Sequence, residues 1–291
     1  MKFASYRAGD GRNGYGMVDG EQIFDLSASS RASLKDFLSL PAAAAEAACK
    51  AALGGAPIAL EKVRLAPVIQ QPGKIVCLGL NYAEHARESG SEIPDYPALF
   101  MRAASSLVGD GDAIVRPLVS EKLDYEAELA VVIGRRGRHI EESNALDFVA
   151  GYTAFNDASV RDYQRRSAQW TAGKNFDGTG ALGPFLVTPD ELPAGAVGLR
   201  IESRLNGRTM QSSTTSDMIF SVQRTIAILS EIMTLEPGDV IATGTPPGVG
   251  HARKPPVWMR AGDVVEIEIE RVGVLRNPIR DERDALAGAA S

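Results

Sequence analysis

The stretch LDYEAELAVVIG, from Leu123 to Gly134, carries three carboxylates at every second position, Asp124, Glu126 and Glu128. Apolar and β-forming residues dominate the rest of the stretch and predict a strand. Alternate side chains of a strand point to the same face, so the three carboxylates would share one face. Like charges on one face need either water or a cation beside them. The pattern therefore predicts either a solvated strand face or a metal site.

Asp157 supplies a further acidic position, in GYTAFNDAS, where an apolar strand meets a polar turn and the start of a helix. The Cα atoms of Glu126 and Glu128 would lie about 6.5 Å apart, close enough for both side chains to reach one ion. Ligation by oxygen alone selects a hard divalent cation such as Mg²⁺, Mn²⁺ or Ca²⁺. Zinc is not indicated by the spacing of the histidines, which are His85, His139 and His251.

His85 lies in NYAEHARE, a segment that predicts a helix beginning at Tyr82 with Asn81 as its N-cap. Glu88 is three residues further on, on the same helical face, and can hold the imidazole in one tautomer. A histidine supported in this way can act as a general base on water. The alternative is a surface ion pair without a catalytic role.

Cationic and amide side chains follow the second acidic position. Helical spacing from Asp157 places Arg161 and Gln164 beside it, where they suit a substrate carboxylate. Lys174, in the loop sequence TAGKNFDGTG, could stabilise an oxyanion. The alternatives are a solvated helix face and an exposed loop lysine.

A glycine- and threonine-rich loop, ATGTPPGVG at residues 242–250, follows a predicted strand. Its backbone N–H groups and the Thr245 hydroxyl could bind an anion. Because no Gly-Lys-Ser/Thr follows, it is not a nucleotide-binding P-loop.

Short strands punctuated by glycine turns predict a strand-dominated α+β fold. A helical patch from Leu34 through residues 42–53 and breakers at 66–73 divide the chain into a small domain, 1–70, and a main domain, 71–291. In the main domain the sequence predicts a hairpin turning at Asn206–Gly207 and a helix from Ser221.

Composition limits the classes of partner. The 291 residues are 44% hydrophobic and 23% charged, with a formal net charge of −6, which argues against nucleic acid or an anionic membrane as partner. Two cysteines, Cys49 and Cys77, provide no disulfide framework. Without an apolar run of membrane-spanning length or a signal core, we expect a cytoplasmic protein.

Taken together, the motifs resemble the fumarylacetoacetate hydrolase superfamily over about Lys74 to Arg280. In family order they are GLNYAEHARE, SSLVGDGDAI, YEAELAVVIG, GYTAFNDASVRD, GKNFDGTGALGP, PGDVIATGTPPGVG and VLRNPI. The resemblance implies a mixed β-roll with a small N-terminal β-rich domain, usually assembled as a homodimer.

The resemblance also implies roles for individual residues. Metal ligands would be Glu126, Glu128 and Asp157, holding Mg²⁺ or Mn²⁺, with Ca²⁺ able to occupy the site in crystals. His85 and Glu88 would form the water-activating pair of a lid helix, and Lys174 would be the active-site lysine. Substrate contacts would come from Arg161, Gln164 and Thr245, and Asp124 would lie behind the ligands or face solvent.

The activity that the resemblance implies first is metal-dependent hydrolysis of an acylpyruvate-type 2,4-diketo acid to pyruvate and a carboxylic acid, in aromatic-compound or sugar-acid catabolism. His85 would deprotonate water, and Lys174 would stabilise the oxyanion. The same site also suits a 2-hydroxyhepta-2,4-diene-1,7-dioate isomerase or an oxaloacetate decarboxylase. A non-catalytic protein that senses a metabolite is the alternative from another class.

Overall fold

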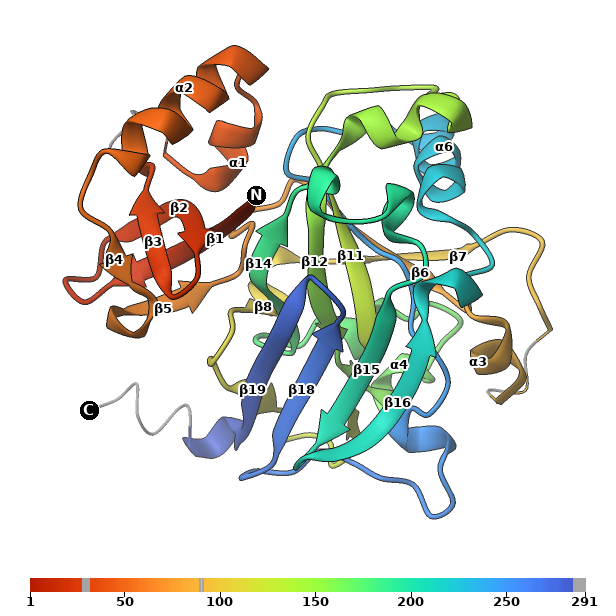
Figure 1. Cartoon of the computed structure of the whole chain (residues 1–291). Helices are drawn as coiled ribbons and strands as arrows, with labels where there is room; N and C mark the ends of the chain where they lie inside the picture. Colours follow the sequence, from red (N-terminus) through yellow and green to blue (C-terminus); the bar gives the residue numbers. More distant parts are fainter. Residues whose placement is uncertain (28–31, 89, 91, 285–291) are drawn as a thin grey trace.

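Residues 1–27, 32–88, 90 and 92–284 are described by a computed structural model of the chain (Figure 1). Its largest sheet has twelve strands, and the strands of the main body run in the order β14, β12, β11, β17, β6, β7. Their bounds are β6 (Ile75–Gly79), β7 (Ala98–Arg102), β11 (Ala127–Ile133), β12 (Val149–Asp157), β14 (Gly180–Val187) and β17 (Val240–Ala242), with β8 (Leu107–Val108) paired to β14.

A second sheet of five strands packs against the large one. In spatial order its strands are β16 (Arg208–Thr214), β15 (Arg200–Leu205), β18 (Val264–Ile269), β19 (Gly273–Asp281) and β9 (Ile114–Arg116). Leu129 and Val131 of β11 join the apolar core with Ile201 and Ile267 of this sheet, whereas Ala130 and Val132 join a second core on the other face. Strand β11 is therefore buried on both faces, which explains its apolar run AVVI.

The predicted strand from Leu123 to Gly134 is divided in the structure. Residues Leu123–Asp124 form β10, which pairs with β13 (Ser159–Val160), and β11 begins only at Ala127. The helix expected directly after Asp157 begins at Arg161 instead, because the intervening residues are paired as strand. The chain thus pairs with β13 at Asp124 and with β12 from Ala127 onwards, and Glu126 lies at this change of partner.

The first 66 residues add a module of strands and helices to the edge of the large sheet. Strand β1 (Lys2–Ala8) pairs with β14, and the other elements are β2 (Asn13–Asp19), β3 (Gln22–Asp25), β4 (Ile58–Ala59), β5 (Val63–Ala66), α1 (Leu34–Leu38) and α2 (Ala42–Leu53). The helical patch is two helices, because the first ends at Leu38 with Ser39 as its C-cap and the second begins after Pro41, which has no N–H to continue a helix. The division at residue 70 stays a prediction.

The bounds of the α-helices in the main body are α3 (Ala83–Glu88), α4 (Arg161–Gln164), α5 (Thr171–Lys174) and α6 (Val222–Ile232). Linking 3-10 helices are η2 (Leu60–Lys62), η3 (Ala104–Ser106), η4 (Glu142–Phe148), η5 (Pro189–Glu191), η6 (Ala194–Ala196), η7 (Thr215–Asp217) and η8 (Gly250–Ala252). Among the described residues no helix is both long and apolar enough to cross a membrane. The predicted α+β class and the hairpin at Asn206–Gly207 are confirmed.

Candidate active site

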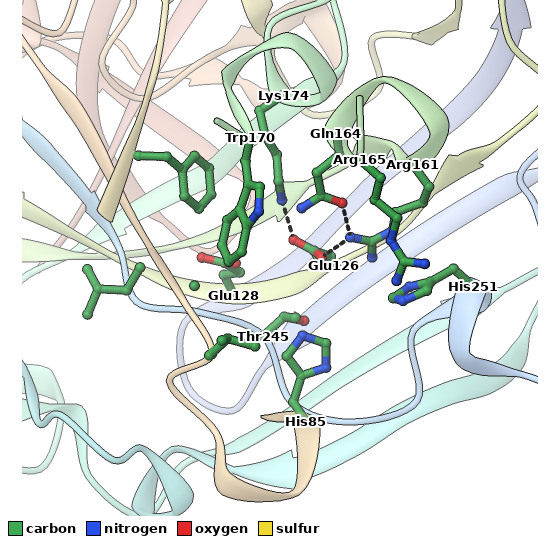
Figure 2. Close-up of a pocket in the computed structure, with 14 residues that line it drawn as sticks. His85, Glu126, Glu128, Arg161, Gln164, Arg165, Trp170, Lys174, Thr245 and His251 are labelled. Atoms are coloured by element: carbon green, nitrogen blue, oxygen red, sulfur yellow. Dashed lines mark hydrogen bonds and ion pairs between the residues drawn. The ribbon is translucent and has the colours of Figure 1, made fainter. Parts of the chain in front are cut away.

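One cavity of about 380 Å³ gathers most of the predicted site residues (Figure 2). It is bounded by the end of β6, by α3, by the start of β11, by α4 and α5, and by the loop after β17. Seven of the nine predicted residues line it: His85, Glu126, Glu128, Arg161, Gln164, Lys174 and Thr245. The other two contact residues that line it, Glu88 through His85 and Asp157 through Lys174.

Glu126, Glu128 and Asp157 form a buried acidic triad. One ligand oxygen from each lies within 4.8 Å of the others, and their exposed fractions are 4%, 1% and 0%. Antiparallel pairing of β11 with β12 brings Asp157 beside Glu126, whose carbonyl accepts from the Asp157 N–H at 3.0 Å. A solvated strand face is therefore wrong for these carboxylates.

Lys174 lies at the end of α5, 1% exposed, and not in an open loop. Its Nζ is 2.6 Å from Glu126 Oε2 and also donates to Asp157 Oδ2. Burial alone would lower the pKa of Lys174, but Asp157 and Glu126 outweigh it and raise that pKa. Lys174 is thus a buried cation that fixes two members of the triad.

Arg161 connects the triad to Asp124, the carboxylate of the opening stretch that was not among the predicted site residues. Its Nε donates to Asp124 Oδ2 at 2.8 Å, and its Nη1 lies 2.7 Å from Glu126 Oε1 and 3.0 Å from Gln164 Oε1. Asp124 is fully buried and also accepts backbone N–H groups of Gly250 and His251. It therefore lies behind the acidic triad and positions Arg161.

The electrostatics of Glu126 and Glu128 differ. Burial would raise the pKa of Glu126, but Arg161 and Lys174 outweigh it and lower that pKa. Burial, followed by repulsion from Asp157 and Glu126, holds the pKa of Glu128 well above its usual range. Within the described chain no ion pair involves Glu128, and the Gly244 N–H donates to it at 2.9 Å.

This donor set fits a hard divalent cation. Three converging carboxylates, of which Glu128 lacks a cationic partner among the described residues, offer oxygen ligands and excess negative charge. A dication on Glu126, Glu128 and Asp157 would relieve that repulsion.

Arg102, at the end of β7, supports the triad and was not found from the sequence. Its Nη1 donates to Asp157 Oδ1 at 2.5 Å and its Nη2 to Thr179 Oγ1 at 2.9 Å. The arginine is 4% exposed, and a side chain at Gly180 would collide with it. The one available signal was an arginine closing the apolar strand ALFMR.

His85 and Glu88 form the predicted pair on α3, with Nδ1 3.0 Å from Glu88 Oε1. Glu88 also accepts the Gly248 N–H at 3.0 Å, which joins α3 to the loop after β17. Asn81 does not cap the helix with its side chain as expected. Its amide instead donates to the Phe220 and Thr243 carbonyls, and so fixes the base of α3 on that loop.

The loop after β17 presents Thr245 to the cavity. The Thr245 hydroxyl accepts a hydrogen bond from Gln211 Nε2 at 2.8 Å, so its own proton is left for a ligand. Gly244 has φ +94°, and a Cβ there would lie 2.8 Å from the Asn81 Cβ. Glycine is therefore required at this turn.

Trp170, Arg165 and His251 also line the cavity and were not among the predicted site residues. The Trp170 ring packs so closely on Gly79 that a Cβ there would lie 2.0 Å from it, and it meets Phe100 edge-on at 5.6 Å. His251 Nδ1 lies 3.4 Å from Asp124 Oδ2.

The family profile described as fumarylacetoacetate (FAA) hydrolase C-terminal matches residues 74–280. A mitochondrial oxaloacetate tautomerase of Xenopus laevis is 42% identical over 289 residues, covering 96% of this chain and 90% of the relative. A human mitochondrial oxaloacetate tautomerase is 48% identical over 217 residues, covering 74% of this chain and 68% of the relative.

Solved structures show the same architecture. A fumarylacetoacetate hydrolase from Exiguobacterium antarcticum superposes with a TM-score of 0.84 at 36% identity, covering 97% of this chain and 100% of that one. Maleylpyruvate hydrolase from Sphingobium sp. SYK-6, solved with manganese(II) and pyruvate, superposes with a TM-score of 0.80 at 30% identity, covering 97% and 99%.

Proposed function

The chain belongs to the fumarylacetoacetate hydrolase family, and on this premise we propose that it is a divalent-cation-dependent enzyme that interconverts the keto and enol forms of oxaloacetate. The observation that carries the proposal is the buried acidic triad, of which Glu126 and Glu128 line the same cavity as a supported histidine and a buried arginine. The substrate is proposed from the relative that matches nearly the whole chain and is named an oxaloacetate tautomerase.

Glu126, Glu128 and Asp157 would hold the cation, with Lys174 and Arg102 fixing two of the three carboxylates. When bound, the cation would act as a Lewis acid on the 2-oxo group and make the neighbouring C–H more acidic.

Arg161 Nη2 is buried and has no hydrogen-bond partner among the described residues. It would donate to the carboxylate next to the 2-oxo group, together with the amide NH₂ of Gln164 and the hydroxyl of Thr245. These contacts orient the C3–H bond in the cavity.

His85 would carry the proton. Its Nδ1 is engaged by Glu88, so the other ring nitrogen is the one that can take a proton from C3 and return it to the oxygen atom of the 2-oxo group. One proton leaves carbon and one reaches oxygen, so the step is balanced without a co-reactant.

Hydrolysis of an acylpyruvate-type diketo acid is the second candidate, and the His85–Glu88 pair favours it. The same nitrogen could take a proton from water, with Lys174 facing the oxyanion. The likeness to maleylpyruvate hydrolase supports this alternative.

The test follows enol-oxaloacetate absorbance in stopped flow, with Mg²⁺ or Mn²⁺ and with EDTA, and assays pyruvate in the same samples. Faster loss of enol with the cation and no pyruvate supports the tautomerase. Stoichiometric pyruvate and a second acid from acetylpyruvate would establish the hydrolase, and pyruvate from oxaloacetate alone would indicate a decarboxylase. Unchanged tautomerisation in Glu126→Gln would contradict the cation site. Unchanged tautomerisation in His85→Asn would contradict the role of His85 as the proton carrier.

A homodimer and a cytoplasmic location stay predictions.

A further inference from the structure

Four of the five described basic side chains that line the cavity face carboxylates. Lys174 contacts Glu126 and Asp157, and Arg161 contacts Asp124 and Glu126. The two histidines also face carboxylates, since His85 meets Glu88 and His251 lies 3.4 Å from Asp124. The positive charges of Lys174 and Arg161 are therefore largely balanced within the protein.

Arg165 is different. It lines the cavity from the C-terminal side of α4, and its side chain makes no hydrogen bond or ion pair with any described residue. The side chain is exposed, so its guanidinium keeps its full charge and its donors for a ligand. Figure 2 shows Arg165, Arg161 and His251 on the same side of the cavity, opposite Trp170.

The two arginines of this side are not equivalent. Arg161 is buried and has one free nitrogen, Nη2, which suffices for the carboxylate beside a 2-oxo group. A second carboxylate on the same substrate needs a cation whose charge is not already balanced. Among the described lining residues, Arg165 is the one that meets this requirement.

We propose that Arg165 is the specificity-determining residue that binds the distal carboxylate of a dicarboxylic 2-oxo acid. The proposal rests on the proposed function and adds how the enzyme distinguishes such acids from monocarboxylic 2-oxo acids. A guanidinium can bind a carboxylate through two parallel N–H donors. Its exposure implies that this selectivity weakens as ionic strength rises.

The test compares oxaloacetate with 2-oxobutyrate, which has a methyl group where oxaloacetate has the distal carboxylate. Binding is measured with Mn²⁺ by quenching of Trp170, which lines the cavity, in a Trp258→Phe background. This readout needs no turnover. The KM and kcat for enol-oxaloacetate are measured in parallel.

Arg165→Gln should weaken oxaloacetate binding and raise its KM by about tenfold or more, and change 2-oxobutyrate binding less than about twofold. Arg165→Lys should recover part of the loss. Arg166→Gln is the matched control, because the neighbouring Arg166 stacks on Tyr163 at 3.6 Å and does not line the cavity.

Equal losses for both acids, no loss for either, or a wild-type protein that does not prefer oxaloacetate would each overturn the role of Arg165. Selective binding of oxaloacetate without any tautomerisation would support that role and overturn the proposed function instead.

Discussion

Replacing Glu128 by glutamine should stabilise the cation-free protein and abolish its response to divalent cations. The substitution keeps the shape of the side chain, and the new amide oxygen can still accept the Gly244 N–H that now lies 2.9 Å from Glu128. What it removes is a buried charge that no cationic side chain of the described chain contacts.

The size of the effect follows from the separation of the carboxylates. At 4.8 Å, the upper limit of the separation between the ligand oxygens, two unit charges repel by about 3.5 kcal/mol at an effective dielectric constant of 20, and Glu128 faces two such neighbours. Burial and those neighbours raise the pKa of Glu128, so a proton already relieves part of the repulsion in the wild-type protein. We therefore expect a gain of about 1–2 kcal/mol in the free energy of unfolding without cation.

The cation should stabilise the wild-type protein but have almost no effect on the variant. At a concentration one hundred times its Kd, a cation adds about 2.7 kcal/mol to wild-type stability, which raises Tm by about 5 °C. The variant, with two carboxylates left, should lose nearly all of this shift.

Thermal unfolding with EDTA and with Mn²⁺ measures both effects. Glu266→Gln on β18 is the control, because Glu266 pairs with Arg204 at 3.0 Å, neither residue lines the cavity, and the change should leave the Mn²⁺ shift unchanged. A Glu128→Gln protein that keeps the full Mn²⁺ shift, or loses several kcal/mol without cation, would refute the reasoning.

Three further perturbations test neighbouring parts of the structure. Lys174→Met should lower the free energy of unfolding in urea by about 3 kcal/mol without cation, since it leaves the buried charges of Glu126 and Asp157 short of a partner. The control Lys62→Met, at an exposed lysine, should lower it hardly at all. A loss below about 1 kcal/mol for Lys174→Met would contradict this reasoning. Arg102→Met should weaken Mn²⁺ binding about 10–100-fold in calorimetric titration, because Asp157 loses its support, and an unchanged Kd would show that the support is not needed. Burial raises the pKa of Cys77. In a Cys49→Ser background at pH 8, the Cys77 thiol of the folded protein should therefore react with a thiol reagent about a hundredfold or more slowly than that of the unfolded protein. Rapid labelling of the folded protein would disprove the burial.

The acidic triad could be predicted because its signals are local. Glu126 and Glu128 alternate along one strand, and Asp157 ends the next strand of the sheet, so period-two spacing is enough to suggest a shared face. Spacing alone could not decide between a solvated strand face and a metal site, because burial of that face depends on residues from other elements.

The arginines show where local reasoning ends. Arg102 reaches Asp157 from a strand 55 positions earlier, a contact that no periodicity encodes. Arg161, Arg165 and Arg166 looked alike in the sequence, yet one is buried among carboxylates, one lines the cavity and one stacks on Tyr163. Helix α4 has only four residues, so helical spacing cannot separate these three environments.

Asn81 shows a local prediction that the tertiary structure overturns. Helix α3 begins at Ala83, one residue later than expected, so Asn81 lies before the N-cap position. Its amide donates to the Thr243 and Phe220 carbonyls, and its oxygen accepts the Phe220 N–H at 2.7 Å. Tertiary hydrogen bonds outweighed the capping preference.

Because β1 pairs with β14, the N-terminal module covers a strand edge that could otherwise pair with another molecule. Lys2 and Phe3 occupy backbone positions opposite Val187 and Leu186, and Phe3 shares an apolar core with Phe155 and Leu182. A protein cut to begin at residue 71 would expose that strand edge and the apolar surface beneath it. Such a fragment should self-associate through β14, so the boundary between the two parts of the chain is a poor place to shorten this protein.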